Sequence, residues 1–537
     1  MKRKLKSGMR KLILFTVFIA LALNSFCKQK EYVISSYGAK ADGKTNNARF
    51  IQKAIDEASS NGGGKVVIPP GNFVSGVLIL KSDVILHLEQ GACLQGSINR
   101  LDYNNPIAMA FLVAQNQRNI SITGEGVIDG RAGELMLDVM RQLRAGTITD
   151  LPRWKVSRPS EGVRPMLVIF KGCDQVNISG VTMKNAASWV QDYINCTNLT
   201  IDGINVQSTS YWNNDGIDIS DCTNVKIINC FVNSADDGIC LKSETPGKYC
   251  DNVYIANCTI RSSASAFKMG TASYGGFKNI KVRDLTVFDT FRSAIAIESV
   301  DGGHIENVDI QNVSATNTGN AVFIRLGHRN KKADVGSVKG IRIANVKAEI
   351  PLYKPDQGYP LEGPPDVNSP DKEKMPARRS GYPFFGHPWL PFNLLPSSIA
   401  GIPDFPVQDV VLENIEITYD GGASKEIACI SPDSVTSVPE CESDYPEFSM
   451  FGELPAWGFY VRHAKGIEMK NVKIRYKEDD FRPAMVFDDV EGIWLSSVDI
   501  LTAKETPVLL LNNVSGEKLD SLRIPIGKVT GIRKMNK

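Results

Sequence analysis

The chain has 537 residues, and 61 lysine and arginine residues against 59 aspartate and glutamate residues leave a net charge of +2. This balance gives no indication of nucleic acid or of a membrane surface as a partner. The length suits two or three ordinary domains or one long repeat domain, and the periodicity of the sequence decides between them.

The first 27 residues have the pattern of an export signal. A basic stretch, MKRKLKSGMRK, precedes the mostly apolar LILFTVFIALAL at 12–23, which is short for a membrane span and typical of a signal-peptide core. Cys27 leaves a lipoprotein signal as an alternative, although such sites normally have a residue smaller than Phe26 before the cysteine. We expect a signal peptide at 1–27 and a periplasmic, cell-surface or extracellular protein, which would meet a membrane only through a lipid at Cys27.

One convincing helix follows, from about Asn46 to Ser60. Phe50, Ile51, Ala54, Ile55 and Ala58 give it an apolar face, and the glycines at 62–64 end it. Because a solenoid needs its open end covered, we expect this helix to be an N-terminal cap.

A short phrase then recurs along the chain. It reads VNISGVTM, LTIDGINV, VKIINCFV, VYIANCTI and IKVRDLTV from residues 176, 199, 225, 253 and 280, and continues to IWLSSVDI at 493–500. Each copy alternates apolar and polar residues and breaks at Gly, Asn or Asp, which is typical of strands and turns. The period predicts a single all-β domain over 31–530, a parallel β-helix.

Cysteines and Asn-x-Ser/Thr triplets follow the same repeat. Cys173, Cys196, Cys222, Cys230 and Cys258 stand at matching places, which favours stacked small side chains over the disulfides that an exported protein could also form. The triplets mostly lie beside the repeated phrases, and we interpret them as turn composition.

Two stretches rich in Pro and aromatic residues interrupt the repeat, at about 351–406 and 431–459. Loops of this length in a compact domain are usually functional or disordered. Phe384, Phe385, Trp389 and Trp457 either rim a cleft where sugar rings stack or hold the insertions to the body.

The phrase Asn-Asp-Gly-Ile at 214–217 returns as Asp-Asp-Gly-Ile at 236–239. An interval of 22 residues is about one coil, so Asn214 should lie beside Asp236 and Asp215 beside Asp237. Carboxylates that close raise one another's pKa values, and a carboxyl held protonated can donate a proton. The alternative is that the acids only cap turns.

These residues resemble glycoside hydrolase family 28, the polygalacturonases and their relatives. The resemblance covers most of the mature chain: the YGAKADGKT…FIQKAIDEA…VVIPPGNF opening, Arg164-Pro165 and the acidic coils. The family's Asn-x-Asp motif matches Asn213, Asn214 and Asp215, and its double aspartate matches Asp236 and Asp237. The resemblance implies a right-handed parallel β-helix and an inverting hydrolase that needs no metal or cofactor.

By the same resemblance, Asp236 would be the general acid, and Asp215 and Asp237 would hold and deprotonate the attacking water. Inversion requires room for that water between acid and base, which lie ~6.5–9.5 Å apart. Asn213 and Asn214 would be polar contacts to the substrate.

The sequence departs from the family at two places. Ala264-Ser265-Ala266-Phe267-Lys268-Met269-Gly270-Thr271 stands where typical members have Gly-His-Gly before Ile-Gly-Ser, and Ala296-Ile297-Glu298 stands where they have the Arg-Ile-Lys carboxylate clamp. Both the histidine and the clamp are therefore missing.

Nearby charged residues suggest replacements for the clamp. Lys242, Lys268, Arg325 and His328 are candidates to bind a uronate carboxylate, to depress the pKa values of the water-activating aspartates, or only to pair with acids. Glu298 would repel a uronate if it faced the cleft, which favours a neutral sugar.

The sequence thus predicts an O-glycosyl hydrolase that acts on galacturonan, rhamnogalacturonan or a related polysaccharide or oligosaccharide, with exo attack as an option. A β-helical polysaccharide lyase and a non-catalytic carbohydrate-binding β-helix are the alternatives. In the non-catalytic case Asp215, Asp236 and Asp237 should face different directions. The oligomeric state is left open.

Overall fold

The computed structural model describes residues 30–154, 156, 158–356, 393–426, 430–504, 507–524 and 531–535. The expected signal peptide with Cys27 lies outside the described residues, and so do Phe384, Phe385 and Trp389. Within the described ranges, no helix is both long and apolar enough to cross a membrane.

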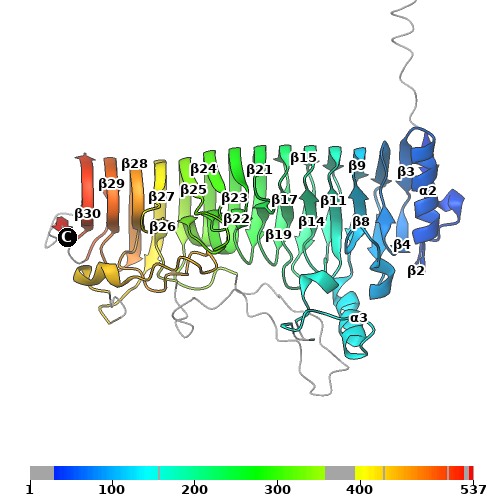
Figure 1. The fold of residues 1–537 in the computed structure, drawn as a ribbon, viewed down its shortest axis with the longest axis horizontal. Coiled ribbons are helices and arrows are strands. Elements are labelled where there is room, and N and C mark those ends of the chain that lie inside the picture. Colours follow the sequence, from blue (N-terminus) through cyan, green and yellow to red (C-terminus); the bar gives the residue numbers. More distant parts are fainter. Residues whose placement is uncertain are drawn as a thin grey trace, which may run out of the picture.

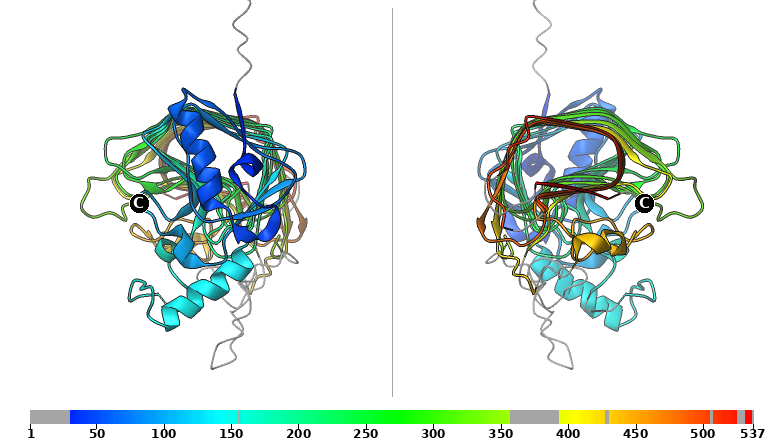
Figure 2. Two further views of the ribbon diagram at one scale, coloured as in Figure 1. Left: turned by 90° about the vertical axis from the view of Figure 1, so that its right-hand side faces the viewer. Right: turned by 90° about the vertical axis from the view of Figure 1, so that its left-hand side faces the viewer.

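The chain forms a right-handed parallel β-helix, as the repeat and the family resemblance predicted. Strands from successive coils stack side by side along the long axis of the molecule (Figure 1). Seen from either end, the stacked coils enclose a core (Figure 2).

Three ladders of parallel strands build the wall. The first contains β1 (Glu31–Val33), β3 (Gly64–Ile68), β6 (Val84–Leu88), β9 (Arg118–Gly124), β12 (Asp174–Ser179), β15 (Thr197–Asp202) and β18 (Thr223–Ile228). The second contains β2 (Asp42–Asn46), β4 (Gly71–Ser75), β7 (Ala92–Gly96), β10 (Val127–Asp129), β13 (Thr182–Lys184), β16 (Asn205–Ser208) and β19 (Phe231–Ser234). The third contains β5 (Leu78–Ile79), β8 (Ala110–Gln115), β11 (Met166–Lys171), β14 (Gln191–Ile194), β17 (Ile217–Ser220), β20 (Ile239–Ser243), β22 (Phe267–Ser273) and β26 (Ser397–Ala400).

Longer strands continue these ladders toward the C-terminus, several of them bending from one ladder into the next. They are β21 (Cys250–Ser262), β23 (Gly276–Ser299), β24 (His304–Leu326), β25 (Ser337–Ile350), β27 (Val407–Gly421), β28 (Phe459–Glu478), β29 (Met485–Ile500) and β30 (Leu509–Asp520). The short strand β31 (Ile532–Met535) pairs with β30. Short 3-10 helices lie at Ile34–Tyr37, Arg100–Tyr103, Glu161–Val163 and Pro432–Ser437.

Helix α2 (Ala48–Ser60) covers the N-terminal end of the solenoid, as predicted (Figure 1). Ile51, Ala54, Ile55 and Ala58 are buried against the first coils. Asn61 and the glycines that follow end the helix, and Gly62 and Gly63 adopt positive φ angles that suit glycine.

Asparagine ladders hold the turns together. Asn224 has a φ of 58°, its amide nitrogen donates to Asn198 Oδ1 at 3.2 Å, and its own Oδ1 accepts from Asn252 Nδ2 at 2.8 Å. Asn is one of the few non-glycine residues that tolerate this left-handed conformation. Most asparagines of the Asn-x-Ser/Thr triplets share it, which supports their interpretation as turn residues: Asn119, Asn195, Asn198, Asn257, Asn312 and Asn513.

The cysteines that follow the repeat are free thiols that pack in the interior, as predicted. Cys173, Cys196, Cys222, Cys230 and Cys258 are all buried, and each belongs to the central apolar cluster. They fill space between the larger Val and Ile side chains of neighbouring coils.

Helix α3 (Ala132–Arg144) was not predicted. Leu135, Met136, Val139 and Met140 form its buried stripe, a spacing that the single-helix interpretation of the sequence overlooked. The described residues after it, 145–154, 156 and 158–163, which include the 3-10 helix at Glu161–Val163, are here called the edge loop. Helix α3 and the edge loop lie on the same side of the solenoid as residues 430–458, here called the cover segment (Figures 1 and 2).

The two predicted interruptions differ in what the structure describes. The solenoid resumes at β26, before the predicted end of the first interruption at residue 406. Trp457, at the end of the second, is buried and contacts Tyr419 and Tyr476 edge to face. This aromatic side chain therefore holds the cover segment to the body.

Candidate active site

The acidic coils lie on the third ladder, in the register that the repeated phrase predicted. Ile217 of β17 pairs with Ile239 of β20, so that the residues two positions earlier, Asp215 and Asp237, occupy equivalent places. The backbone N–H of Gly216 donates to the carbonyl of Asp237 at 2.9 Å, which fixes this alignment.

Strand alternation then separates the core from the site. Ile217, Ile219, Ile239 and Leu241 point into the central apolar cluster. Because successive side chains of a strand point to opposite faces, the residues between them point outward. These are Asp218 and Ser220 from β17 and Cys240 and Lys242 from β20.

Two lysines bind the acids in this outward layer. Lys242 Nζ lies 3.1 Å from Asp215 Oδ2 and 2.9 Å from Asp218 Oδ1. On the following coil, Lys268 Nζ lies 3.0 Å from Asp237 Oδ2. Both lysines are buried, and the burial that would lower their pKa values is outweighed by the surrounding acids, which raise them well above the usual value. Both side chains therefore carry a positive charge.

Asp236 is the most exposed of the three motif aspartates. Its side chain is part of a residue that is 8% exposed, against 4% for Asp215 and 3% for Asp237. Asp236 Oδ1 accepts a hydrogen bond from the backbone N–H of Asp237 at 3.2 Å. All three are buried, and Asp236 keeps the largest contact with solvent.

Asp215 and Asp237 differ in their pKa values. Burial raises the pKa of Asp215 well above its usual value; Lys242 opposes this effect, and repulsion from the acids Asp218, Asp236 and Asp237 adds to it. Asp237 is also buried, but Lys268 and Arg292 outweigh burial, so its pKa lies below the usual value. Asp237 is therefore ionised more readily than Asp215.

Asn213 and Asn214 have different surroundings. Asn213 Oδ1 accepts from Arg164 Nη2 at 2.8 Å, and Arg164 also donates to the carbonyl of Trp212 at 2.7 Å. Asn214 is fully buried, donates to the carbonyls of Ala186 and Ser188, and accepts from Ser208 Oγ. These bonds give Asn214 a structural role in place of the substrate contact that the sequence suggested.

Comparison with known proteins places this arrangement in a family. The family model described as Glycosyl hydrolases family 28 matches residues 59–350, more than half of the chain. The chain belongs to this family. It is 25% identical over 322 residues to the exo-poly-alpha-D-galacturonosidase of Dickeya chrysanthemi, covering 50% of this chain and 52% of that protein. It is also 25% identical over 321 residues to a probable polygalacturonase of Vitis vinifera, covering 56% of this chain and 58% of that protein. The chain thus spans about half the length of the curated relatives it matches.

Two solved structures share the fold of this family member. A hyperthermoactive exopolygalacturonase from Thermotoga maritima has a TM-score of 0.56 at 21% identity, over 73% of this chain and 87% of that chain. The family 28 exopolygalacturonase of Yersinia enterocolitica has a TM-score of 0.54 at 18% identity, over 95% of this chain and 78% of that chain.

In this family 28 chain, the positions of the missing clamp do not face an open site. Ala296 is buried beneath the cover segment, and Glu298 is 1% exposed with Oε2 3.8 Å from Lys268 Nζ. Burial raises the pKa of Glu298 to about 7, and Lys268 opposes the shift. Glu298 therefore does not face the cleft as a repelling charge, because its side chain is enclosed beside a cation.

Arg325 and His328 also differ from the expectation. Arg325 is 1% exposed, and its guanidinium donates to the carbonyls of Gly401 and Glu440, both at 2.7 Å. The backbone N–H of His328 donates to the carbonyl of Glu442 at 2.6 Å. Arg325 therefore attaches the cover segment to the solenoid in place of the predicted contact with substrate. The imidazole of His328 is half-buried with Nε2 2.9 Å from the carbonyl of Ala333, and its predicted contact with substrate stays a prediction.

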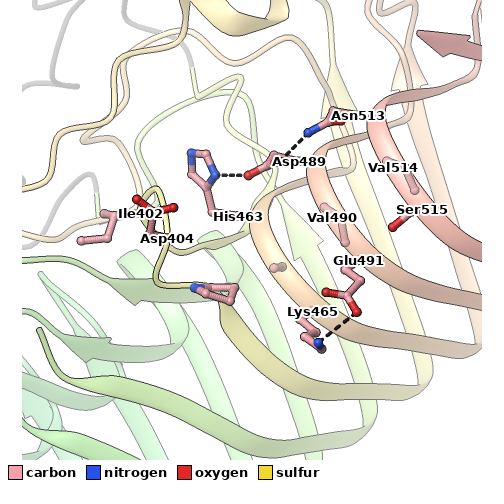
Figure 3. Close-up of a pocket in the computed structure, with 12 residues that line it drawn as sticks. Ile402, Asp404, His463, Lys465, Asp489, Val490, Glu491, Asn513, Val514 and Ser515 are labelled. Atoms are coloured by element: carbon pink, nitrogen blue, oxygen red, sulfur yellow. Dashed lines mark hydrogen bonds and ion pairs between the residues drawn. The ribbon is translucent and has the colours of Figure 1, made fainter. Parts of the chain in front are cut away.

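A polar pocket of about 340 Å³ lies on the C-terminal coils, and one residue of its lining, His463, also contacts the cover segment (Figure 3). His463 Nδ1 lies 2.7 Å from Asp489 Oδ2, and His463 Nε2 lies 3.1 Å from Glu440 Oε2 on the cover segment. Asn513 Nδ2 donates to Asp489 Oδ1 at 2.6 Å. These contacts give His463 a role in holding the cover segment.

Sequence reasoning missed the residues that border the acids from other segments. Arg292 pairs with Glu447 of the cover segment at 3.0 Å, and Lys268 Nζ donates to Tyr445 Oη at 3.2 Å. Trp189 places its ring centroid 4.3 Å from Lys242 Nζ. Lys268 and Tyr445 are 177 residues apart, so no local pattern in the sequence pairs them.

Proposed function

We propose that this chain is an exported inverting glycoside hydrolase that acts on pectin, either galacturonan or rhamnogalacturonan, or on a related polysaccharide. Family membership supports hydrolysis as the reaction. The observation that carries the proposal is the pair of adjacent aspartates in different settings: Asp236 is the most exposed of the motif acids, and Asp237 is held ionised beside Lys268.

The reaction follows from those settings. Asp236 gives its proton to the glycosidic oxygen as the bond from that oxygen to the anomeric carbon breaks. A water attacks the anomeric carbon from the opposite face, and Asp237 takes the proton that the water loses. Asp215, whose pKa is raised, holds the same water by a hydrogen bond. The product has inverted configuration at the anomeric carbon.

The two alternatives explain the site less well. A polysaccharide lyase removes a carbon-bound proton, whereas the family of this chain is one of hydrolases. A non-catalytic β-helix predicted that Asp215, Asp236 and Asp237 face different directions. Against this alternative, Asp215 and Asp237 occupy equivalent places on adjacent coils, and Asp236 and Asp237 both contribute to the raised pKa of Asp215.

Exo attack is part of the proposal. Tyr445 and Glu447 bring the cover segment directly against the lysine and arginine next to Asp237. We call the outward-facing acids and their lysines the acidic layer: Asp215, Asp218, Asp236, Asp237, Lys242 and Lys268. A wall at this end of the acidic layer would stop a polysaccharide from passing through the site. The relatives named as exo-acting enzymes agree with this arrangement.

The test is hydrolysis of a panel of homogalacturonan, rhamnogalacturonan, their oligosaccharides and neutral glycans, with chromatography of the products. We expect saturated monosaccharides of inverted configuration to accumulate from the start of the reaction. The D236N variant should lose activity by about 10²- to 10⁴-fold while its circular dichroism and melting temperature stay unchanged. An active D236N enzyme, or unsaturated products, would overturn the proposal.

A further inference from the structure

Three cations stack on aromatic rings around the acidic layer. Lys242 Nζ lies 4.3 Å from the ring centroid of Trp189, and Lys268 Nζ lies 5.3 Å from that of Tyr445. The guanidinium carbon of Arg158 lies 4.4 Å from the ring centroid of Trp212. A cation over an aromatic face is held in place without an acid, so its charge stays available.

Arg158 differs from the two lysines in its partners. Each lysine forms an ion pair with an aspartate of the acidic layer. Among the residues that the structure describes, Arg158 makes no ion pair, and its contacts are with the rings of Trp212 and Trp154. Its Nε is buried and has no hydrogen-bond partner. An unsatisfied buried donor is costly, which makes a bound anion favourable there.

The position of Arg158 places it at the edge of the site. Trp212 directly precedes Asn213, the first residue of the acidic motif, and Arg164 binds both residues. The edge loop that carries Arg158 is anchored beside it, because the backbone N–H of Ser160 donates to Asp150 Oδ2 at 2.7 Å. Arg158 therefore borders the N-terminal side of the acidic layer, whereas Tyr445 borders the C-terminal side.

We infer that Arg158 binds a carboxylate of the substrate and so replaces the missing clamp from the other side of the site. A guanidinium fork matches a carboxylate through two parallel hydrogen bonds, and the rings of Trp212 and Trp154 keep that fork in one orientation. The inference rests on the proposed function and narrows it, because it makes a uronic acid the sugar recognised next to the acids.

Most other charged groups near Arg158 are already engaged, and the exposed Arg153, over the same Trp154 ring, is tested separately below. Asp150 is occupied by Ser160, and Arg164 uses its guanidinium on the carbonyls of Ala187 and Trp212 and on Asn213. Lys242 and Lys268 already face aspartates. A substrate carboxylate that entered beside either lysine would meet the repulsion of those acids.

The experiment measures binding in a D236N background by isothermal titration calorimetry, so that no substrate is consumed. The probes are a saturated oligogalacturonate and the same oligosaccharide with its carboxyl groups reduced to alcohols. We expect R158Q to weaken binding of the acidic oligosaccharide about 10- to 100-fold and to leave binding of the reduced one unchanged. R158K, which keeps the charge and loses the fork, should fall between them.

The matched control is R153Q, on the same loop and near the same Trp154 ring but with an exposed side chain. It should change neither affinity. Equal losses on both probes would show that Arg158 only holds the edge loop and would overturn the inference, as would unchanged affinity for the acidic probe. If the wild-type chain hydrolysed only neutral glycans, the Arg158 inference would fail and the proposed hydrolase would stand. If the wild-type chain bound the acidic probe through Arg158 but hydrolysed nothing, the inference would stand and the proposed hydrolase would fail.

Discussion

One line of outward-facing residues changes character along the third ladder. In register, Val113 and Ile169 are followed by Asp192, Asp218, Cys240 and Lys268, and then by Ala296, Phe323, Ser398, Tyr460, Val486 and Leu510. The charged stretch, Asp192 to Lys268, lies beside the motif acids Asp215, Asp236 and Asp237, which directly precede β17 and β20. The apolar stretch after Lys268 is buried under Phe448, Phe451, Leu454 and other residues of the cover segment.

The comparison shows what locates the site. Both stretches have the same strands, the same alternation and the same spacing between coils. They differ in their covering. The apolar stretch lies under the cover segment, whereas the charged stretch lies beyond the edge of that segment. Lys268 is the last charged residue of the line, and Tyr445 of the cover segment contacts it there. The cover segment thus buries the apolar half of this face and reaches as far as Lys268, beside the acids that we propose as catalytic.

Replacing Asp237, the ionised acid beside the charged stretch, should have the largest effect on activity. D237N keeps the shape of the side chain but cannot take a proton from water, so we expect kcat to fall by about 10²- to 10⁴-fold. The control is D174N, which changes a half-buried aspartate at the start of β12 that accepts from Thr197 and Asn198. Steady-state kinetics on the best substrate of the panel decide the matter. A D237N enzyme with more than a tenth of wild-type activity would remove Asp237 from the mechanism.

Opening the apolar stretch should cost stability. Phe448 is 1% exposed and contacts Phe291 edge to face, with the ring centroids 6.2 Å apart. F448A should lower the free energy of unfolding by about 3 to 5 kcal/mol, because it leaves a cavity beneath the cover segment. Y254A, which truncates an exposed ring, should change it by less than about 0.5 kcal/mol. Urea denaturation measures both variants, and similar losses would mean that the cover segment adds little.

The ion pair between Lys268 and Asp237, where the charged stretch meets the cover segment, should set the lowest pH at which the protein is active. Asp237 must be ionised to accept a proton, and Lys268 keeps its pKa below the usual value. In K268M that pKa rises, so activity should be lost at a higher pH than in the wild type when the pH is lowered. K278M, which removes a partly exposed partner of Asp251, is the control. An unshifted acid limb in the pH dependence of kcat/KM would assign that limb to another group.

The sequence predicted those parts of the molecule that a repeat encodes. The β-helix, its capping helix, the buried cysteines and the stacking of Asp215 on Asp237 all follow from local periodicity and from the 22-residue interval. It did not predict helix α3, although Leu135, Met136, Val139 and Met140 carried the necessary spacing. This spacing occurs only once between long strand repeats, which hide it in a search for periodicity.

The side-chain partners of the site could not be predicted in the same way. The sequence indicates Lys242 and Lys268 as candidates. Their pairing with Asp215 and Asp237 depends on the side-chain rotamers, which the sequence does not specify. Arg325 appeared suited to bind substrate until the fold placed it under the carbonyls of the cover segment. Contacts between segments far apart in the sequence, such as Lys268 with Tyr445, have no local signature.

The smallest expected effect on activity comes from changing the asparagine turn ladder, which lies away from the acids. N224A removes the hydrogen bonds to Asn198 and Asn252 and places alanine at a φ of 58°, so we expect a loss of about 1 to 3 kcal/mol in unfolding free energy. N224G tolerates that φ and loses only the bonds, so it should be the milder change, and the difference between the two variants measures the backbone strain. Neither should alter kcat/KM, because the side chain is exposed on the first ladder, away from the acids. A fall in kcat/KM with unchanged stability would mean that the turn ladder and the site are coupled, and that the charged stretch is not independent of the rest of its coil.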